Sequence, residues 1–207
     1  MTSRALILER VRRNEPAAVP MPAMPPLVPA GPSMLARFAE ALERMGGQLL
    51  NEPAAGSIDA LIRERFPDAR VVCSATPEVA GTMAFESVAD PRELKDVDVG
   101  VVRAAFGVAE TGSVWLSEAE LGINALGFLA QHLVVLLDPD AIVPDLHHAY
   151  RHPGFHRARY AVLMSGPSAT ADIEGVLVRG AQGIRSLTVL IIRPAVLPAA
   201  LSPWRST

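Results

Sequence analysis

Apolar residues recur along the chain in two alternating patterns. From Ser33 to Met45, and again after Ser57, apolar positions three or four residues apart predict helices with one buried face. A further helix is predicted from Asp138 or Asp140 to about Tyr150. Short runs rich in apolar residues predict strands at residues 48–50, 70–73, 97–103, 106–109, 114–116, 132–137, 160–164 and 187–192. The last of these is expected to be buried on both faces, and 132–137 is expected to be a central strand. The alternation predicts an α/β fold with an open, mostly parallel sheet and flanking helices.

The stretch 160–192 predicts a strand, a turn, a helix and a second strand. The turn is Ser165-Gly166-Pro167-Ser168. Ser168 or Thr170 is a suitable N-cap for a helix that extends to about Ala181 and has apolar residues on one face. Because parallel strands joined by a helix form a right-handed crossover, the stretch predicts a βαβ unit.

Proline-rich segments near both ends set the domain boundaries. Residues 3–13 predict a helix too short to be stable alone in water, and residues 16–32 contain too many prolines for a helix or a central strand. We divide the chain into an N-terminal helix and proline-rich arm (1–32), an α/β domain (33–193) and a proline-containing tail (194–207). We expect the arm to pack on its own domain or on a neighbouring subunit, in a homo-oligomer.

Charge and hydropathy exclude several classes of partner. The 207 residues carry a net charge of −3 with acidic and basic residues interspersed, so we expect no binding to nucleic acid or to an anionic membrane. No apolar run approaches the roughly 20 residues of a membrane-spanning helix, and the charged N-terminus does not resemble a signal peptide. We expect a cytoplasmic protein.

The cysteine and histidine content limits metal and redox chemistry. Cys73 is the single cysteine, which excludes a disulfide framework and cannot alone hold a zinc ion or an iron–sulfur cluster. Its place in an apolar strand predicts a small buried side chain. Four histidines cluster at His147, His148, His152 and His156. Two of them have the spacing of metal ligands on a helix, but no acidic third ligand is suitably spaced, so we expect a solvated helix end and no bound metal.

A turn around Glu110 is the first place for chemistry. It lies between the apolar runs 106–109 and 114–116, which predict an antiparallel pair. A carboxylate there is a candidate base or nucleophile if burial raises its pKa, and a solvent-exposed turn glutamate is the alternative. Gly112 lets the backbone turn tightly or lets a ligand approach.

The turn that begins at Ser165 is the second place for chemistry. Its hydroxyls and backbone N–H groups lie at the N-terminus of the predicted helix, which suits a phosphate or a carboxylate, and helix capping alone is the alternative. Ligands of open α/β sheets bind outside the carboxyl ends of the strands. Because both turns follow strands, we expect them to border one cleft.

The residues of these turns also resemble the signatures of a known family. Residues 165–183 (SGPSATADIEGVLVRGAQG) are similar to the C-terminal signature of the lactate-utilization protein C group, the LUD-domain family. Residues 108–114 (VAETGSV) resemble its second signature, and residues 131–135 (QHLVV) resemble its HIxVV strand. Where the family commonly has His-Gly-Pro, this chain has Gln182-Gly183-Ile184, so the role of that histidine is not carried over.

The resemblance implies a fold similar to the NagB/RpiA/CoA-transferase group and a role in a system that oxidises L-lactate to pyruvate. The chain alone would bind no cofactor, because iron–sulfur clusters are expected on partner proteins. Glu110 becomes the candidate catalytic residue. A small carboxylate or acyl ligand is expected at the strand carboxyl ends, near Thr111, Gly112, His132, Ser165, Gly166, Ser168 and Thr170.

Three alternatives stay open. One is a free-standing enzyme of the sugar-phosphate isomerase or CoA-transferase type, and another is a non-catalytic interaction scaffold. For His132, a core histidine hydrogen-bonded to the backbone is the alternative to a ligand-binding role.

Overall fold

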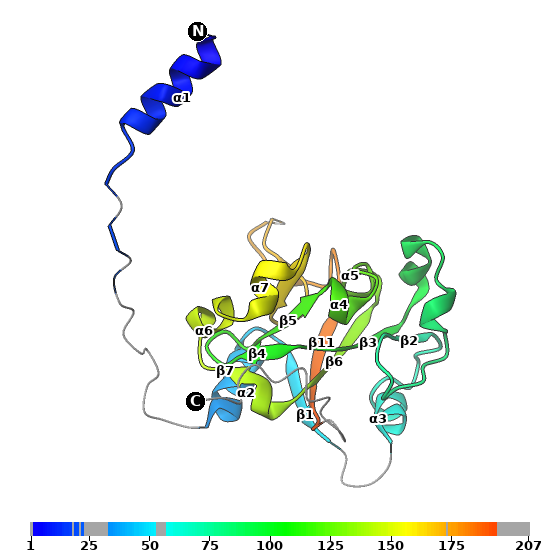
Figure 1. Cartoon of the computed structure of the whole chain (residues 1–207). Helices are drawn as coiled ribbons and strands as arrows, with labels where there is room; N and C mark the ends of the chain where they lie inside the picture. Colours follow the sequence, from blue (N-terminus) through cyan, green and yellow to red (C-terminus); the bar gives the residue numbers. More distant parts are fainter. Residues whose placement is uncertain are drawn as a thin grey trace.

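A five-stranded parallel sheet forms the centre of the structure, a computed structural model that describes residues 2–17, 19–20, 22, 33–52, 57–172 and 174–193 (Figure 1). The strand order is β1-β11-β6-β3-β2, and every neighbouring pair is parallel. The strands are β1 (Gln48–Asn51), β2 (Val72–Ser74), β3 (Val99–Arg103), β6 (His132–Leu137) and β11 (Ser186–Ile191). The predicted α/β fold with a mostly parallel sheet is confirmed.

A second sheet of four strands packs beside the first, in the order β7-β4-β5-β8. The pairs β4–β5 and β5–β8 are antiparallel, as predicted for the two strands around Glu110, whereas β7 pairs with β4 in parallel. These strands are β4 (Phe106–Val108), β5 (Ser113–Ser117), β7 (Ile142–Val143) and β8 (Ala161–Met164).

Two longer helices of the α/β domain begin at the caps predicted from the sequence. The Ser33 hydroxyl accepts a hydrogen bond from the Ala36 N–H at the start of α2 (Met34–Arg44). Ser57 caps α3 (Ile58–Arg65) in the same way. The remaining described helices of this domain are short: α4 (Glu118–Leu121), α5 (Leu126–Leu129), α6 (Leu146–Tyr150), α7 (Pro153–Arg157), η1 (Phe85–Ser87), η2 (Pro91–Asp96) and η3 (Pro139–Ala141).

Alternate residues of the parallel strands enter two different parts of the core. On one face, Val134 and Leu136 of β6 pack with α3. On the opposite face, Leu133 and Val135 pack with α2 and with β5 of the second sheet. The outer face of the second sheet is covered by α6 and α7. Continuous apolar runs were therefore required, because both faces of the parallel sheet are buried.

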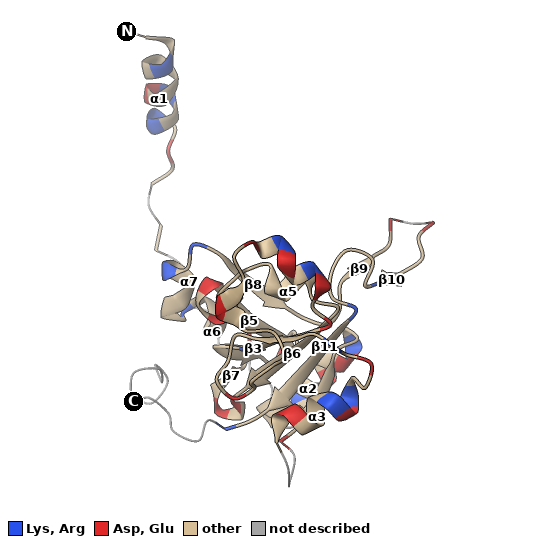
Figure 2. Ribbon diagram, turned by 90° about the vertical axis from the view of Figure 1, so that its right-hand side faces the viewer, with Lys and Arg blue, Asp and Glu red and all other residues tan. Residues whose placement is uncertain are grey.

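The helix predicted from Ser168 to Ala181 is wrong. The described residues of this stretch form an antiparallel hairpin of β9 (Ala169–Thr170) and β10 (Val178–Arg179), which extends from the domain in Figure 2. Gly175 has φ +70° and the preceding Glu174 has φ +53°, so the chain turns where a helix would continue. The apolar residues of the predicted helical face do not share a buried side, since Leu177 is 58% exposed.

The predicted βαβ unit is consequently wrong as well. The strand before the hairpin, β8, belongs to the second sheet, and the strand after it, β11, belongs to the parallel sheet. The chain between them therefore passes from one sheet to the other. Of the residues assigned to the predicted helix, Ile173 lies outside the described residues.

The helix predicted from Asp138 or Asp140 begins later than expected. A 3-10 turn and strand β7 occupy its first residues, and α6 begins only at Leu146, with Asp145 as its cap. Ile142 and Val143 pair with β4, and Pro144 lacks the N–H that a helix interior needs. The β-branched residues Ile142 and Val143 favour a strand, and Pro144 prevents a helix from running through this stretch, so the helix begins only after it.

The N-terminal helix α1 (Ser3–Arg13) is present as predicted and has no buried residue. In Figures 1 and 2 it lies apart from the two sheets. Most of the proline-rich stretch that follows, and residues 194–207, lie outside the described residues, so the three-part division of the chain stays a prediction. Within the described ranges, no helix has both the length and the apolar character needed to cross a bilayer.

Candidate functional site

The two turns singled out in the sequence border one hollow of about 500 Å³ on the surface of the second sheet. Glu110 follows β4 and Ser165 follows β8, and these strands end at the same edge of that sheet. Helix α2 closes another side of the hollow. The lining residues are Ala41, Arg44, Met45, Glu110, Thr111, Ser113, Leu146, Leu163 and Ser165.

A direct hydrogen bond joins the two turns. The Ser165 hydroxyl donates to the Thr111 carbonyl oxygen at 2.9 Å. The hydroxyls of Thr111 and Ser113 lie 2.5 Å apart and share a further hydrogen bond. Segments 54 positions apart in the sequence thus form one polar wall of the hollow.

Glu110 is a surface-exposed carboxylate with a defined position. Its Oε2 accepts a hydrogen bond from the Leu146 N–H at 3.0 Å, at the first residue of α6. Its own N–H donates to the Pro144 carbonyl oxygen at 3.1 Å. The side chain is therefore held at the rim of the hollow and is not sequestered from solvent.

Arg44 is the charged residue of this hollow that the sequence alone does not single out. It is the last residue of α2 and is exposed at the rim. Among the described residues it has no hydrogen-bond or ion-pair partner, so its guanidinium is available to an anion. A cation in the last turn of a helix is ordinarily explained by the helix dipole, and only the tertiary structure brings it to Glu110.

The glycines of the two turns have a packing role. A β-carbon on Gly166, which has φ +88°, would lie 3.0 Å from the carbonyl carbon of Met45 at the end of α2. A β-carbon on Gly112, which has φ +63°, would lie closer still to the backbone of α2. Both turns thus hold the same helix, which fixes Arg44 beside them.

Ser168 and Thr170 are not brought into this hollow. The backbone of Ser168 bonds to Ile184 and Gly180, and the Thr170 hydroxyl accepts a hydrogen bond from the Asp172 N–H at 3.3 Å. Both residues belong to the β9–β10 hairpin or its base. Because no helix begins there, the predicted helix N-terminus that would hold an anion is absent from the described hairpin.

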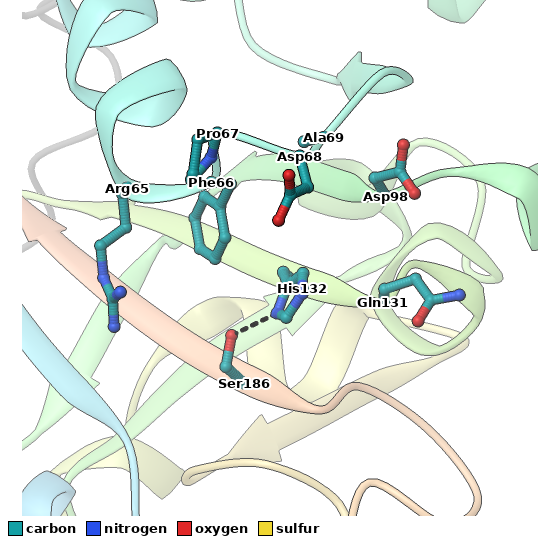
Figure 3. Close-up of a pocket in the computed structure, with 9 residues that line it drawn as sticks. All are labelled: Arg65, Phe66, Pro67, Asp68, Ala69, Asp98, Gln131, His132 and Ser186. Carbon is teal, nitrogen blue, oxygen red and sulfur yellow. Dashed lines mark hydrogen bonds between the residues drawn. The ribbon is translucent and has the colours of Figure 1, made fainter.

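The structure does not bring His132 into the hollow with Glu110 and Ser165. His132 is the first residue of β6, at the amino edge of the parallel sheet, and its side chain is on the face that packs with α3. It lines a separate pocket of about 370 Å³, drawn in Figure 3, with Arg65, Phe66, Pro67, Asp68, Ala69, Asp98, Gln131 and Ser186.

His132 is paired with a serine from the neighbouring strand. Its Nδ1 lies 2.7 Å from the Ser186 hydroxyl, and the two residues are register partners in β6 and β11. The Phe66 ring lies 4.8 Å from the imidazole, centroid to centroid. The sequence indicates where each residue of this pair lies, because each stands at the start of an apolar run that predicts a strand. The pairing of the two strands places their first residues side by side.

Burial lowers the pKa of His132, and the positive charges of Arg185 and Arg65 lower it further. Asp98 has a smaller, opposite effect. The pKa of Asp98 is itself lowered, since its carboxylate accepts hydrogen bonds from the Val71 and Arg70 N–H groups at 2.9 and 2.8 Å. The pocket therefore combines a neutral imidazole, cations and a fixed carboxylate at neutral pH.

The other metal and redox candidates are structural in the described part of the chain. Cys73 is fully buried, and burial raises the pKa of its thiol. His148 Nδ1 lies 2.7 Å from the Asp145 carboxylate, which caps α6. Within the described ranges, no three His, Cys, Asp or Glu side chains are grouped closely enough to hold a metal ion.

The fold and the two hollows define an α/β domain with one candidate site at an end of the second sheet and another at the amino ends of the parallel strands. The LUD domain family matches residues 58–192, and the chain belongs to this family. A crystal structure of a DUF162 family protein from Deinococcus radiodurans has the same fold, with a TM-score of 0.58 and 18% identity. The alignment covers 77% of this chain and 96% of that one. The similarity to the NagB/RpiA/CoA-transferase group stays a prediction.

Two curated relatives are more similar in sequence. An uncharacterized protein of Neisseria meningitidis is 27% identical over 172 residues, which cover 80% of this chain and 68% of the relative. The lactate utilization protein C of Deinococcus radiodurans is 30% identical over 103 residues, which cover 48% of this chain and 49% of the relative. The match thus spans about half the length of that second relative.

Proposed function

We propose that this LUD-domain protein is a component of a lactate-utilization system and supports the oxidation of L-lactate to pyruvate. Family membership and the similarity to a lactate utilization protein C support this role. The catalytic redox centres, iron–sulfur clusters, belong to partner proteins in this proposal. The single cysteine of the sequence agrees with that division, because an iron–sulfur cluster needs several thiolate ligands.

The observation that carries the proposal is the meeting of Arg44 and Glu110 in one hollow. A 2-hydroxy carboxylate has an anionic group and a hydroxyl donor on adjacent carbons. The Arg44 guanidinium is suited to the carboxylate, and the Glu110 carboxylate is suited to accept the hydroxyl hydrogen bond. Thr111 and Ser113 add hydroxyls at the same wall.

The same geometry favours ligand recognition over nucleophilic catalysis by Glu110. The carboxylate is exposed and already accepts a hydrogen bond from the Leu146 N–H. A nucleophilic carboxylate of the CoA-transferase type needs a water-excluding site, and the rim of an open hollow does not provide one. We therefore assign Glu110 to orienting the ligand.

Growth of a deletion strain on L-lactate tests this assignment. Complementation with wild type should restore growth, and complementation with Glu110→Gln should not. The amide oxygen of glutamine still accepts the Leu146 hydrogen bond, so the purified variant should keep the wild-type melting temperature. Glu64→Gln, at an exposed position of α3 outside the hollow, is the matched control and should grow normally. Full growth of Glu110→Gln would overturn the site.

A ligand screen separates this role from the alternatives. L-lactate should stabilise the wild type by about 2.7 kcal/mol at a hundredfold excess over Kd, seen as a higher melting temperature, and should stabilise Arg44→Gln less. Stabilisation by sugar phosphates or acyl-CoA, with turnover by the isolated chain, would favour a free-standing enzyme. Normal growth of both Glu110→Gln and Arg44→Gln would favour an interaction scaffold.

A further inference from the structure

The pocket at the amino edge of the parallel sheet is not used by the proposed function. It lies on the α3 face of the parallel sheet, whereas the Glu110 hollow is lined by α2, the β4–β5 turn, α6 and the end of β8. In Figure 3 the Arg65 side chain lies on one side of the His132 imidazole, Asp98 and Gln131 lie on the other, and Asp68 lies above the ring. The pocket therefore has a basic side and an acidic side.

We propose that this pocket is a second binding site, for a small singly charged oxyanion held by the Arg65 guanidinium, the His132 imidazole and the Ser186 hydroxyl. These groups come from α3, β6 and β11, three elements that the core holds rigidly together. Arg65 donates one hydrogen bond to the Gln48 side chain, which fixes the guanidinium and leaves its other N–H groups for a ligand.

The tautomer and the protonation state of His132 decide which way the His132–Ser186 hydrogen bond runs. A neutral imidazole protonated at Nδ1 frees the serine hydroxyl but carries no charge, so the protonated imidazole favours an anion most. With a neutral imidazole that accepts at Nδ1, the Ser186 hydroxyl donates to the ring and is unavailable to a ligand. With a protonated imidazole, Nδ1–H donates to the Ser186 oxygen, so the hydroxyl proton turns toward the pocket. The Nε2–H, which the neutral ring that accepts at Nδ1 already has, then carries part of a positive charge as well. Anion binding is therefore coupled to protonation of the histidine.

The charged groups around His132 set the sign and size of this coupling. Arg185 and Arg65 oppose protonation, and Asp98 favours it less strongly. An oxyanion between Arg65 and His132 would offset the arginine charges and raise the pKa of His132. The nearby Asp68 and Asp98 carboxylates disfavour a ligand with two or more negative charges, which limits the site to monoanions.

Histidine titration by NMR tests this second site with the full-length protein. The His132 ring signal is identified by its loss in His132→Gln. Sodium L-lactate and sodium phosphate, each added at constant ionic strength against sodium chloride, probe a carboxylate and a phosphate. We expect at least one of the two anions to raise the midpoint of the His132 titration by about one pH unit. The anion that does so shows whether the site prefers a carboxylate or a phosphate.

Variants assign the effect to the pocket. Arg65→Gln should abolish the anion-dependent shift, and Ser186→Ala should reduce it. Arg63→Gln, on the same helix and outside the pocket, should leave the shift unchanged. Glu110→Gln should also leave it unchanged, which separates this site from the lactate site proposed above. An unchanged His132 midpoint with both anions, or a shift that persists in Arg65→Gln, would overturn the proposal.

Discussion

Gly112 of the β4–β5 turn lies directly against the backbone of Leu42 in helix α2. A β-carbon on this glycine would overlap the Leu42 nitrogen and lie 2.6 Å from the carbonyl carbon of Ala41. The turn that carries Glu110 is thus in backbone contact with the helix that carries Arg44. Because Gly112 has no side chain, the turn can approach the helix this closely, which sets the positions of Arg44 and Glu110 relative to each other.

Gly112→Ala should therefore destabilise the fold strongly. Gly175→Ala is the matched control, because Gly175 also has a positive φ, +70°, but nothing lies within 4 Å of its added β-carbon. Both variants bear the left-handed backbone strain, and only Gly112→Ala bears the overlap with α2. We expect its free energy of unfolding in urea to be lower than that of Gly175→Ala by about 1–3 kcal/mol. Equal losses would contradict the close approach.

The Asp98 carboxylate stabilises the chain before β2. It accepts hydrogen bonds from the Arg70 and Val71 N–H groups across 28 and 27 positions of sequence. Asp98→Ala should lower the free energy of unfolding by about 1–3 kcal/mol, because one half-buried N–H would lose its partner. The exposed Asp96 has no such bond among the described residues, and Asp96→Ala should be nearly neutral. A neutral Asp98→Ala would contradict the assignment.

His132 should make the stability depend on pH with a definite sign. Its pKa in the folded protein is lowered below the ordinary 6.5, mainly by burial. The contribution to stability is then fully present above pH 6.5 and is lost as the pH falls through the folded-state pKa. His152, whose pKa burial also lowers, acts in the same direction.

Urea unfolding at about pH 7.5 and about pH 5 measures this effect. The loss of stability on acidification should be smaller in His132→Gln than in wild type, and His152 should account for part of the remainder. Identical losses in the two proteins would show that His132 titrates normally.

The arm should control the oligomeric state. The α1 helix has 11 residues, none of them buried, and Ile7 and Val11, one turn apart, are 61% and 62% exposed. Because so short a helix is marginal in water, it needs a docking surface. Sedimentation velocity should show an oligomer for the full chain, and a smaller species for Ile7→Glu and for a chain without residues 2–32. Arg12→Gln should sediment as wild type, and a monomeric full chain would contradict this role.

Local patterns in the sequence predicted those parts of the fold that local physics determines. Helices α2 and α3 have a serine cap and one apolar face, and the parallel strands are continuous apolar runs, so each is recognisable in isolation. The hairpin at β9–β10 was mistaken for a helix because apolar spacing alone does not reveal the positive φ of Glu174 and Gly175.

The candidate site was predictable only in part. The sequence places Glu110 and Ser165 after strands, and the structure joins their turns by the Ser165–Thr111 bond. The sequence does not reveal that β8 belongs to the second sheet, nor that the His132 side chain lies on the face covered by α3. Such facts depend on how distant segments pair, and Arg44 entered the site for the same reason.

A pull-down from lactate-grown cells tests the central claim most directly. The tagged full-length chain is recovered and assayed for bound iron and for L-lactate-dependent dye reduction. A component of a lactate-oxidising complex should bring down both iron and activity, and neither should appear with the tag alone. A chain recovered without partners, iron or lactate-dependent activity would contradict the proposed function.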